Sequence, residues 1–96
     1  MNNFDFNNLL KAIKKNASFD KDKIQMIAAT TRNYNFSSQQ IYALVKTMSF
    51  DDGKLQVAKS LYTKCVDQQN FYNVYEALSF SSSKNELSDY ISRVSR

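Results

Sequence analysis

The sequence predicts an all-α protein in which about six short helices form three helix-hairpin repeats of about 30 residues each. Three observations lead to this prediction: a short motif recurs along the chain, the apolar residues between its copies follow a helical period, and residues that favour tight turns are nearly absent. The chain of 96 residues has no proline and one glycine, Gly53. Most β-hairpins need these residue types, so helices are favoured over a sheet.

The recurring motif is a phenylalanine that directly precedes an aspartate. It occurs as Phe19 and Asp20, then 31 residues later as Phe50 and Asp51, while Phe80 follows after 30 more residues with a serine in place of the aspartate. Each copy is predicted to begin a helix. With the aspartate at the N-cap, its carboxylate would accept hydrogen bonds from the free N–H groups of the first turn.

The phenylalanines of this motif are predicted to be packed. If the aspartate is the N-cap, Phe19 lies at N′ and Ile24 at N4, and Phe50 and Leu55 repeat the arrangement. Residues at these two positions commonly pack together as a hydrophobic staple, which fixes how the chain enters the helix. We therefore expect Phe19 and Phe50 to be shielded from water.

Capping signals mark the other helix starts. Ser37 and Gln40 form a capping box flanked by Phe36 and Ile41 as a staple, and one period later Asp67 is the predicted cap of the fifth helix. The remaining predicted caps are Ser83 with Glu86 for the last helix and Asp5 or Asn7 for the first.

These signals place six helices in one domain that spans residues 1–96. The predicted helices cover residues 6–16, 21–33, 38–48, 52–65, 68–78 and 84–94. The repeats cover residues 18–48 and 49–78, with partial units at 5–17 and 79–96. Short connections favour antiparallel neighbours, and this pattern fits both a compact bundle and a short solenoid.

Apolar residues in each predicted helix recur with a period near 3.6, as burial of one helix face requires. The predicted core consists of Phe6, Leu9, Leu10, Ile13, Ala17, Ile24, Ile27, Ala28, Ile41, Leu44, Val45, Met48, Leu55, Ala58, Leu61, Tyr62, Cys65, Phe71, Val74, Tyr75, Leu78, Leu87, Tyr90, Ile91 and Val94. Superposed repeats bring equivalent residues together, such as Ile13, Leu44 and Val74, so we expect them to fill equivalent layers.

The composition is that of an ordinary globular protein, with 43% hydrophobic and 23% charged residues. No apolar run is long enough for a membrane span, and the first residues do not resemble a signal peptide, so a soluble cytoplasmic protein is expected. The chain has no histidine and one cysteine, Cys65, which is predicted to be a buried small hydrophobe. We expect no cofactor, no metal site and no enzymatic activity.

Five segments together resemble the family known as domain of unknown function 4476. They run from Phe19 to Ile24, Phe36 to Ile41, Phe50 to Leu55, Asp67 to Tyr72 and Phe80 to Leu87. The resemblance extends from about residue 4 to residue 91. It implies a small helical domain, found in bacteria and eukaryotes and often appended to other segments, and it provides no catalytic residues to transfer.

A lysine occupies the same place in each repeat, as Lys23, Lys54 and Lys84. With the predicted caps, Lys23 and Lys54 lie at N3, where a cation opposes the helix dipole. One explanation is an anion site at the helix start. The alternative is structural: each lysine packs its stem over the neighbouring phenylalanine and pairs with Asp20 or Asp51.

The preferred function is a non-enzymatic adaptor that docks a segment of a partner protein in a groove between helix hairpins. Tyr42 and Tyr72 are equivalent by repeat and fall beside the apolar stripe, where exposed tyrosines make good interface anchors. Core packing is the alternative for both. The predicted partner-binding residues are therefore Tyr42, Tyr72, Lys23 and Lys54.

A second hypothesis is binding of nucleic acid or of an anionic membrane or phosphate ligand. The net charge is +4, and basic residues occur near both termini and at the helix starts. Those near the termini are Lys11, Lys14, Lys15, Arg93 and Arg96. They would form one patch only if the termini meet, and a solvated helix face is the simpler interpretation.

Overall fold

The computed structural model describes residues 1–95, and in that range the protein is all-α, as predicted. The elements are α1 (Asn3–Asn16), α2 (Asp20–Thr30), α3 (Ser38–Lys46), α4 (Asp51–Tyr62), the short 3₁₀ helix η1 (Gln68–Asn70), α5 (Tyr72–Tyr75) and α6 (Ser81–Val94). An isolated bridge pair joins Phe36 and Cys65. None of the helices in residues 1–95 is both long and apolar enough to cross a membrane.

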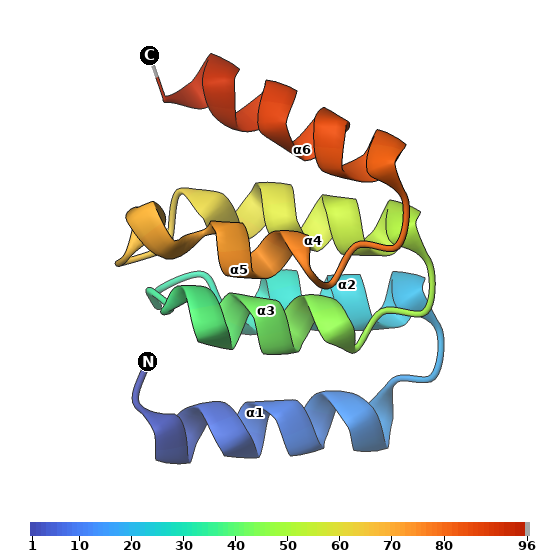
Figure 1. Ribbon diagram of the computed structural model, residues 1–96. Coiled ribbons are helices and arrows are strands. Elements are labelled where there is room, and N and C mark those ends of the chain that lie inside the picture. Colours follow the sequence, from blue (N-terminus) through green and yellow to red (C-terminus); the bar gives the residue numbers. More distant parts are fainter. Residues whose placement is uncertain (96) are drawn as a thin grey trace.

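Consecutive helices run antiparallel, and the even-numbered helices form a row (Figure 1). Helix α4 lies in the middle of this row and contacts α2 on one side and α6 on the other. Helices α3 and α5 lie side by side against the row, and α1 packs on α2 at one end of the stack. The starts of α2, α4 and α6 therefore all lie at the same end of the molecule, which we call the clasp end.

The molecule fits a compact bundle. Its radius of gyration is 12.5 Å, and a compact chain of this length is expected to have a value of about 12.5 Å. One core runs through it. Ile13, Leu44 and Val74, which were predicted to be equivalent, are all fully buried, and so are Phe36 and Leu87. The core prediction is wrong at Ala28 and Val94, which are both exposed; Ala28 lies at the edge of a shallow recess between α2 and α4.

Local caps at the starts of α1 and α3 follow ordinary rules. The capping box at α3 is confirmed: the Gln40 N–H donates to Ser37 Oγ at 3.1 Å, and the Ser37 N–H donates to Gln40 Oε1 at 3.1 Å. Helix α1 begins earlier than predicted because Asn2, rather than Asp5 or Asn7, is its cap. The Asn2 side chain accepts the Asp5 N–H at 2.7 Å.

The prediction that Asp20 and Asp51 are N-caps is wrong by one residue. Phe19 and Phe50 are the N-cap residues of α2 and α4, and no side chain caps these two helices. The aspartates are the first helical residues. Their carboxylates still lie in the first turn, where the helix dipole favours negative charge, but they accept hydrogen bonds from elsewhere.

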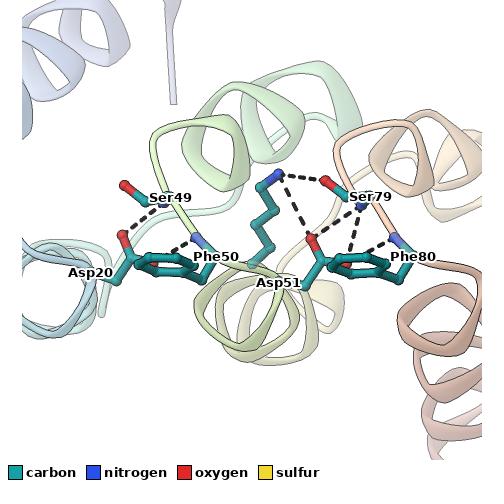
Figure 2. A network of polar contacts seen from close by, with 7 residues as sticks. Asp20, Ser49, Phe50, Asp51, Ser79 and Phe80 are labelled. Carbon is teal, nitrogen blue, oxygen red and sulfur yellow. Dashed lines mark hydrogen bonds and ion pairs between the residues drawn. The ribbon is translucent and has the colours of Figure 1, made fainter.

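Each of these aspartates binds the start of the next even-numbered helix. Asp20 accepts the N–H groups of Ser49 at 2.8 Å and Phe50 at 3.0 Å, so the first residue of α2 holds the residues that lead into α4. We call this contact a clasp. Asp51 makes the second clasp, and Figure 2 shows the two as successive copies of one contact.

The second clasp explains how α6 begins. Asp51 accepts the N–H groups of Ser79 at 3.1 Å and Phe80 at 3.0 Å, and Phe80 is the N-cap. Helix α6 consequently starts at Ser81, three residues before the predicted start, and the predicted capping box of Ser83 and Glu86 is not the cap. The Ser83 side chain is buried and lies near the Asp51 carboxylate instead.

Asp67 also binds a distant helix start and does not cap its own helix with its side chain. Its carboxylate accepts the Ser38 N–H at 2.7 Å and the Ser38 hydroxyl at 2.9 Å, which ties the segment after α4 to the first residue of α3. The hydrogen bond from the Ser38 backbone is the main cause that lowers the pKa of Asp67 to about 2, and bonds from Asn70 and from the Ser38 side chain add to it against the opposing effect of desolvation.

The predicted fifth helix over 68–78 is broken into η1 and the four-residue α5. Residues 64–66 form a turn that is bonded to Phe36, whose N–H donates to the Lys64 carbonyl at 2.9 Å and whose carbonyl accepts the Val66 N–H at 2.9 Å. Together with the fixed Asp67 side chain, these bonds prevent a helix from starting there. The following backbone then forms bonds of the i to i+3 type, such as Ala77 to Val74.

Helices α2, α3 and α4 end two or three residues before their predicted ends. At α2 the Thr31 hydroxyl donates to the Ile27 carbonyl at 2.7 Å. The Lys64 ammonium group, from the end of α4, donates to the carbonyls of Thr31 at 3.1 Å and Arg32 at 2.9 Å. These contacts satisfy the carbonyl groups that a helix end leaves without partners.

We predict that Asp51→Ala destabilises the protein by about 1–2 kcal/mol, because it removes a charged acceptor from two backbone N–H groups. The measurement is urea unfolding followed by circular dichroism. Asp52→Ala is the control, since Asp52 is exposed and a neighbour of Asp51 on α4; it should cost less than about 1 kcal/mol, from the helix dipole alone. Equal losses for the two variants would contradict the role given to the clasp.

We also predict that Asp67 makes stability depend on pH in acid. Because its pKa is lowered from 3.8 to about 2 on folding, its contribution is complete above about pH 4 and is lost as the pH falls toward 2. Urea unfolding between pH 2 and 6 should show this loss in the wild type and a shallower dependence in Asp67→Asn. Asp89→Asn, on the exposed face of α6, serves as the control. Parallel curves for wild type and Asp67→Asn would refute the prediction.

Candidate functional site

Three phenylalanines project into solvent at the clasp end. Phe19, Phe50 and Phe80 are 74%, 73% and 63% exposed, although hydrophobic staples were predicted to shield the first two. We call these three residues the phenylalanine row. Each is the N-cap of an even-numbered helix, and these helices all start at the same end of the bundle (Figure 1). Figure 2 shows Phe50 and Phe80 at equivalent places.

At Phe50 the clasp is the reason that the staple prediction fails. The Phe50 N–H donates to Asp20 at 3.0 Å, and the Phe50 carbonyl accepts the Lys54 N–H at 3.1 Å as the first bond of α4. This fixes Phe50 as the N-cap, so Leu55 falls at N5, and the N′ to N4 spacing of a staple does not occur. The backbone is held on both sides of the ring while the ring itself stays outside the core. The clasps bind the starts of α4 and α6 and not that of α2, but Phe19 is the N-cap of α2, so Ile24 likewise falls at N5.

Exposing these rings has a cost in free energy. Burial of a phenylalanine side chain is worth about 1.5–3 kcal/mol, and the chain does bury Phe6, Phe36 and Phe71. Phe4 is exposed as well, but it lies at the start of α1, at the opposite end of the bundle. Because the three exposed rings occupy equivalent helix starts, this edge is the main candidate for an interaction surface.

A groove runs beside the row between α2 and α4. It has a volume of about 520 Å³. Its apolar part is formed by Ile24, Phe50 and Gly53, and its walls carry Lys21 and Gln25 on α2 and Asp52 and Gln56 on α4. Gly53 is needed for the close approach of the two helices, because a Cβ atom there would lie 3.0 Å from Asp20 Oδ2.

The repeated lysines lie at N4 rather than N3, and two of them have partners within the chain. The Lys23 ammonium group donates to the carbonyl of Thr47 at 2.6 Å, at the end of α3. That of Lys54 lies 3.5 Å from Ser79 Oγ and 3.8 Å from Asp51 Oδ1. Both lysines therefore help the aspartates to hold the loop that precedes the next even-numbered helix. These contacts favour the structural explanation of Lys23 and Lys54, and their part in partner binding stays a prediction.

The two predicted tyrosine anchors lie on the α3 and α5 side of the bundle. Tyr72 is 64% exposed, whereas Tyr42 is half-buried and has the Lys46 ammonium group 5.7 Å from its ring centre. Tyr42 lines a second, more polar recess of about 370 Å³ with Gln39, Asn73 and Glu76. The structure thus does not gather the four predicted binding residues on one surface, since Lys23 and Lys54 belong to the even-numbered row.

Cys65 is buried, as predicted. Desolvation by burial is the main cause that raises the pKa of its thiol to about 11, so the thiolate form is scarce at neutral pH. Within residues 1–95, no three side chains of the usual metal-ligating types come together as a site for an ion.

The basic residues near the two termini do not converge. Helices α1 and α6 lie at opposite ends of the stack (Figure 1), so Lys11, Lys14 and Lys15 are separated from Arg93 by the helices between them. The predicted contribution of Arg96 lies outside the described residues. The three lysines of α1 are exposed on their own helix.

Comparison with protein families gives one match, to the model described as domain of unknown function (DUF4476), over residues 1–91. The chain belongs to the DUF4476 family. The resemblance seen in the sequence is thereby confirmed. No curated protein and no solved structure matches this DUF4476 chain.

The sequence shows that Phe19, Phe50 and Phe80 recur at a regular spacing, but it does not show that their rings are exposed. In this DUF4476 chain the motif that was interpreted as a buried staple becomes the main candidate site. The groove was also missed as a set of residues, because Lys21, Gln25, Asp52 and Gln56 look like ordinary solvated positions until α2 and α4 are placed side by side.

We predict that the row contributes little to stability. Phe19→Ala, Phe50→Ala and Phe80→Ala should each change the free energy of unfolding by at most about 0.5 kcal/mol, because exposed rings make few contacts that unfolding removes. Phe36→Ala is the matched control, since Phe36 is fully buried, and it should cost about 3–5 kcal/mol. Urea denaturation checks both, and a loss above 2 kcal/mol at any row position would show that its ring is packed.

Proposed function

We propose that this protein is a non-enzymatic helical adaptor module that docks a partner protein on the phenylalanine row and the adjoining groove. The observation that carries the proposal is the exposure of 74%, 73% and 63% at three equivalent phenylalanines. Aromatic residues are the commonest energetic anchors of protein interfaces. The clasps hold the backbone below Phe50 and Phe80, which lowers the conformational entropy that would be lost on binding a partner.

The charges beside the row support a protein partner over an anionic polymer. Lys21 and Lys84 are exposed near it, but Asp22 and Asp52 are exposed there as well. A surface of mixed sign around apolar anchors resembles the polar rim of a protein interface, whereas phosphate binding requires an excess of lysine and arginine.

Lys23 and Lys54 have a supporting role in this proposal. They hold the loops that carry Phe50 and Phe80, and so they would position the anchors rather than touch the partner. Tyr72, which is exposed on another face, could anchor a second contact. A cytoplasmic location, expected from the sequence, is part of the same proposal.

The test compares partners retained by three immobilised forms of the chain from a native lysate of the source cells. The triple variant with Phe19, Phe50 and Phe80 replaced by serine should lose specific partners that the wild type retains, because it loses all three anchors. Phe4→Ser combined with Val66→Ser is the control, since these residues are exposed but lie outside the row. Identical sets of retained proteins for the triple variant and the wild type would contradict the proposal.

The same three forms discriminate the hypothesis of anionic ligands. Binding to a phosphate polymer such as heparin or DNA should fall steeply as salt rises, and it should not depend on the row. Retention of protein partners through aromatic anchors should change little between 0.1 and 0.5 M salt, where the Debye length falls from about 10 Å to about 4 Å. If every retained ligand is a nucleic acid and is lost in salt, the basic face of α1 becomes the preferred site.

A further inference from the structure

The groove between α2 and α4 is suited to one kind of occupant. It lies beside Phe50, and its length is set by the first two turns of two helices that run parallel. On α2, Lys21 and Gln25 are four residues apart and share a face, and on α4 Asp52 and Gln56 do the same. The floor between these walls is formed by Ile24 and Gly53, with the Asp20 carboxylate of the first clasp beside Gly53.

We infer that this groove binds an amphipathic helix of a partner protein, with apolar residues on Phe50 and Ile24 and opposite charges on its two flanks. The inference rests on the proposed function and specifies the kind of partner. It also makes Phe50 the principal anchor of the row and gives roles to Lys21 and Asp52, which the sequence did not single out.

The secondary structure of the occupant follows from what the groove lacks. Within residues 1–95 the only bridge pair is the buried one at Phe36 and Cys65, so no strand edge offers hydrogen bonds to an extended segment. An extended segment would leave its backbone groups without partners over the floor formed by Ile24 and Gly53. A helix satisfies its own backbone and presents side chains at i, i+3, i+4 and i+7, which is the usual way in which a helical segment fills a groove.

The charges on the occupant follow from the two walls. Lys21 and Asp52 are both exposed, and neither takes part in an ion pair within residues 1–95. They stand on opposite walls of the groove. A helix lying between them meets a cation on one flank and an anion on the other. It therefore needs an acidic residue on one side of its apolar stripe and a basic residue on the other, and it can satisfy this in either direction along the groove.

The equivalent position between α4 and α6 is filled by larger or more buried side chains. The counterpart of Ile24, which is half-buried, is the buried Leu55, and the counterpart of Gly53 is Ser83, whose side chain lies near the Asp51 carboxylate. Phe80 is therefore an exposed ring beside a more filled surface, and it provides a matched control for Phe50. The two residues have the same place in their helices and similar exposure.

The experiment uses three synthetic helical peptides of about 21 residues, long enough for stable helices when cross-linked. They share one leucine stripe and differ only in their flanks: one acidic and one basic, both acidic, or both basic. Fluorescence anisotropy measures their binding to the full chain. The peptide with mixed flanks should bind the wild type about two- to fivefold more tightly than the others, as expected for exposed charge pairs.

Variants of the walls should change this preference. Asp52→Lys makes both walls basic, so the peptide with two acidic flanks should become the tightest, and Lys21→Glu should favour the peptide with two basic flanks. Phe50→Ala should weaken the mixed peptide by about tenfold or more, whereas Phe80→Ala should change its affinity less than twofold.

The possible failures are distinguishable. Equal loss in Phe50→Ala and Phe80→Ala, or an unchanged preference in the wall variants, would overturn the groove inference. If no peptide binds while the triple serine variant still loses its lysate partners, the groove inference fails and the proposed function stands. If the peptides bind equally well to Phe50→Ala and the triple variant also retains every partner, both fail.

Discussion

The structure depends on a carboxylate at the start of one helix that accepts two backbone N–H groups at the start of another. Asp20 does this for α4 and Asp51 for α6, with donor to acceptor distances of 2.8–3.1 Å. The first residues of a helix have N–H groups without intrahelical partners, and the residues before them need acceptors too. One aspartate therefore stabilises its own helix through the dipole and aligns its neighbour at the same time. Because the contact repeats, the three even-numbered helices start level with one another.

Exposure of Phe50 and Phe80 is a consequence of that alignment. A residue whose N–H is held by the preceding helix and whose carbonyl begins the next one has little freedom to turn its side chain inward. Phe50 has both restraints, and the lysine that follows four residues later is used to hold a loop and does not cover the ring. The rings are thus displayed by the same bonds that fix the fold, which means that a partner would meet a surface that is already ordered.

The sequence was sufficient for features whose partners are close in the chain. The capping box of Ser37 and Gln40 spans three residues, and the buried layer of Ile13, Leu44 and Val74 follows from helical periodicity, so both could be predicted. The contacts of Asp20, Asp51 and Asp67 could not be predicted. Each of these aspartates is acceptable as a local cap, but its carboxylate bonds to residues about 30 positions away. The loss of the fifth helix has the same origin, since contacts of residues 64–67 with the start of α3 override local helix signals. Predicting the groove would require knowing which helices are neighbours, and hydrophobic periodicity does not provide this information.

The clasp contact is not repeated at the start of α6, where the first helical residue is Ser81. This serine occupies the place that Asp20 and Asp51 hold in their helices, yet a hydroxyl has neither the charge nor the second oxygen with which a carboxylate grips two donors. Ser81 therefore cannot hold two backbone N–H groups of another helix start in the way that Asp20 and Asp51 do.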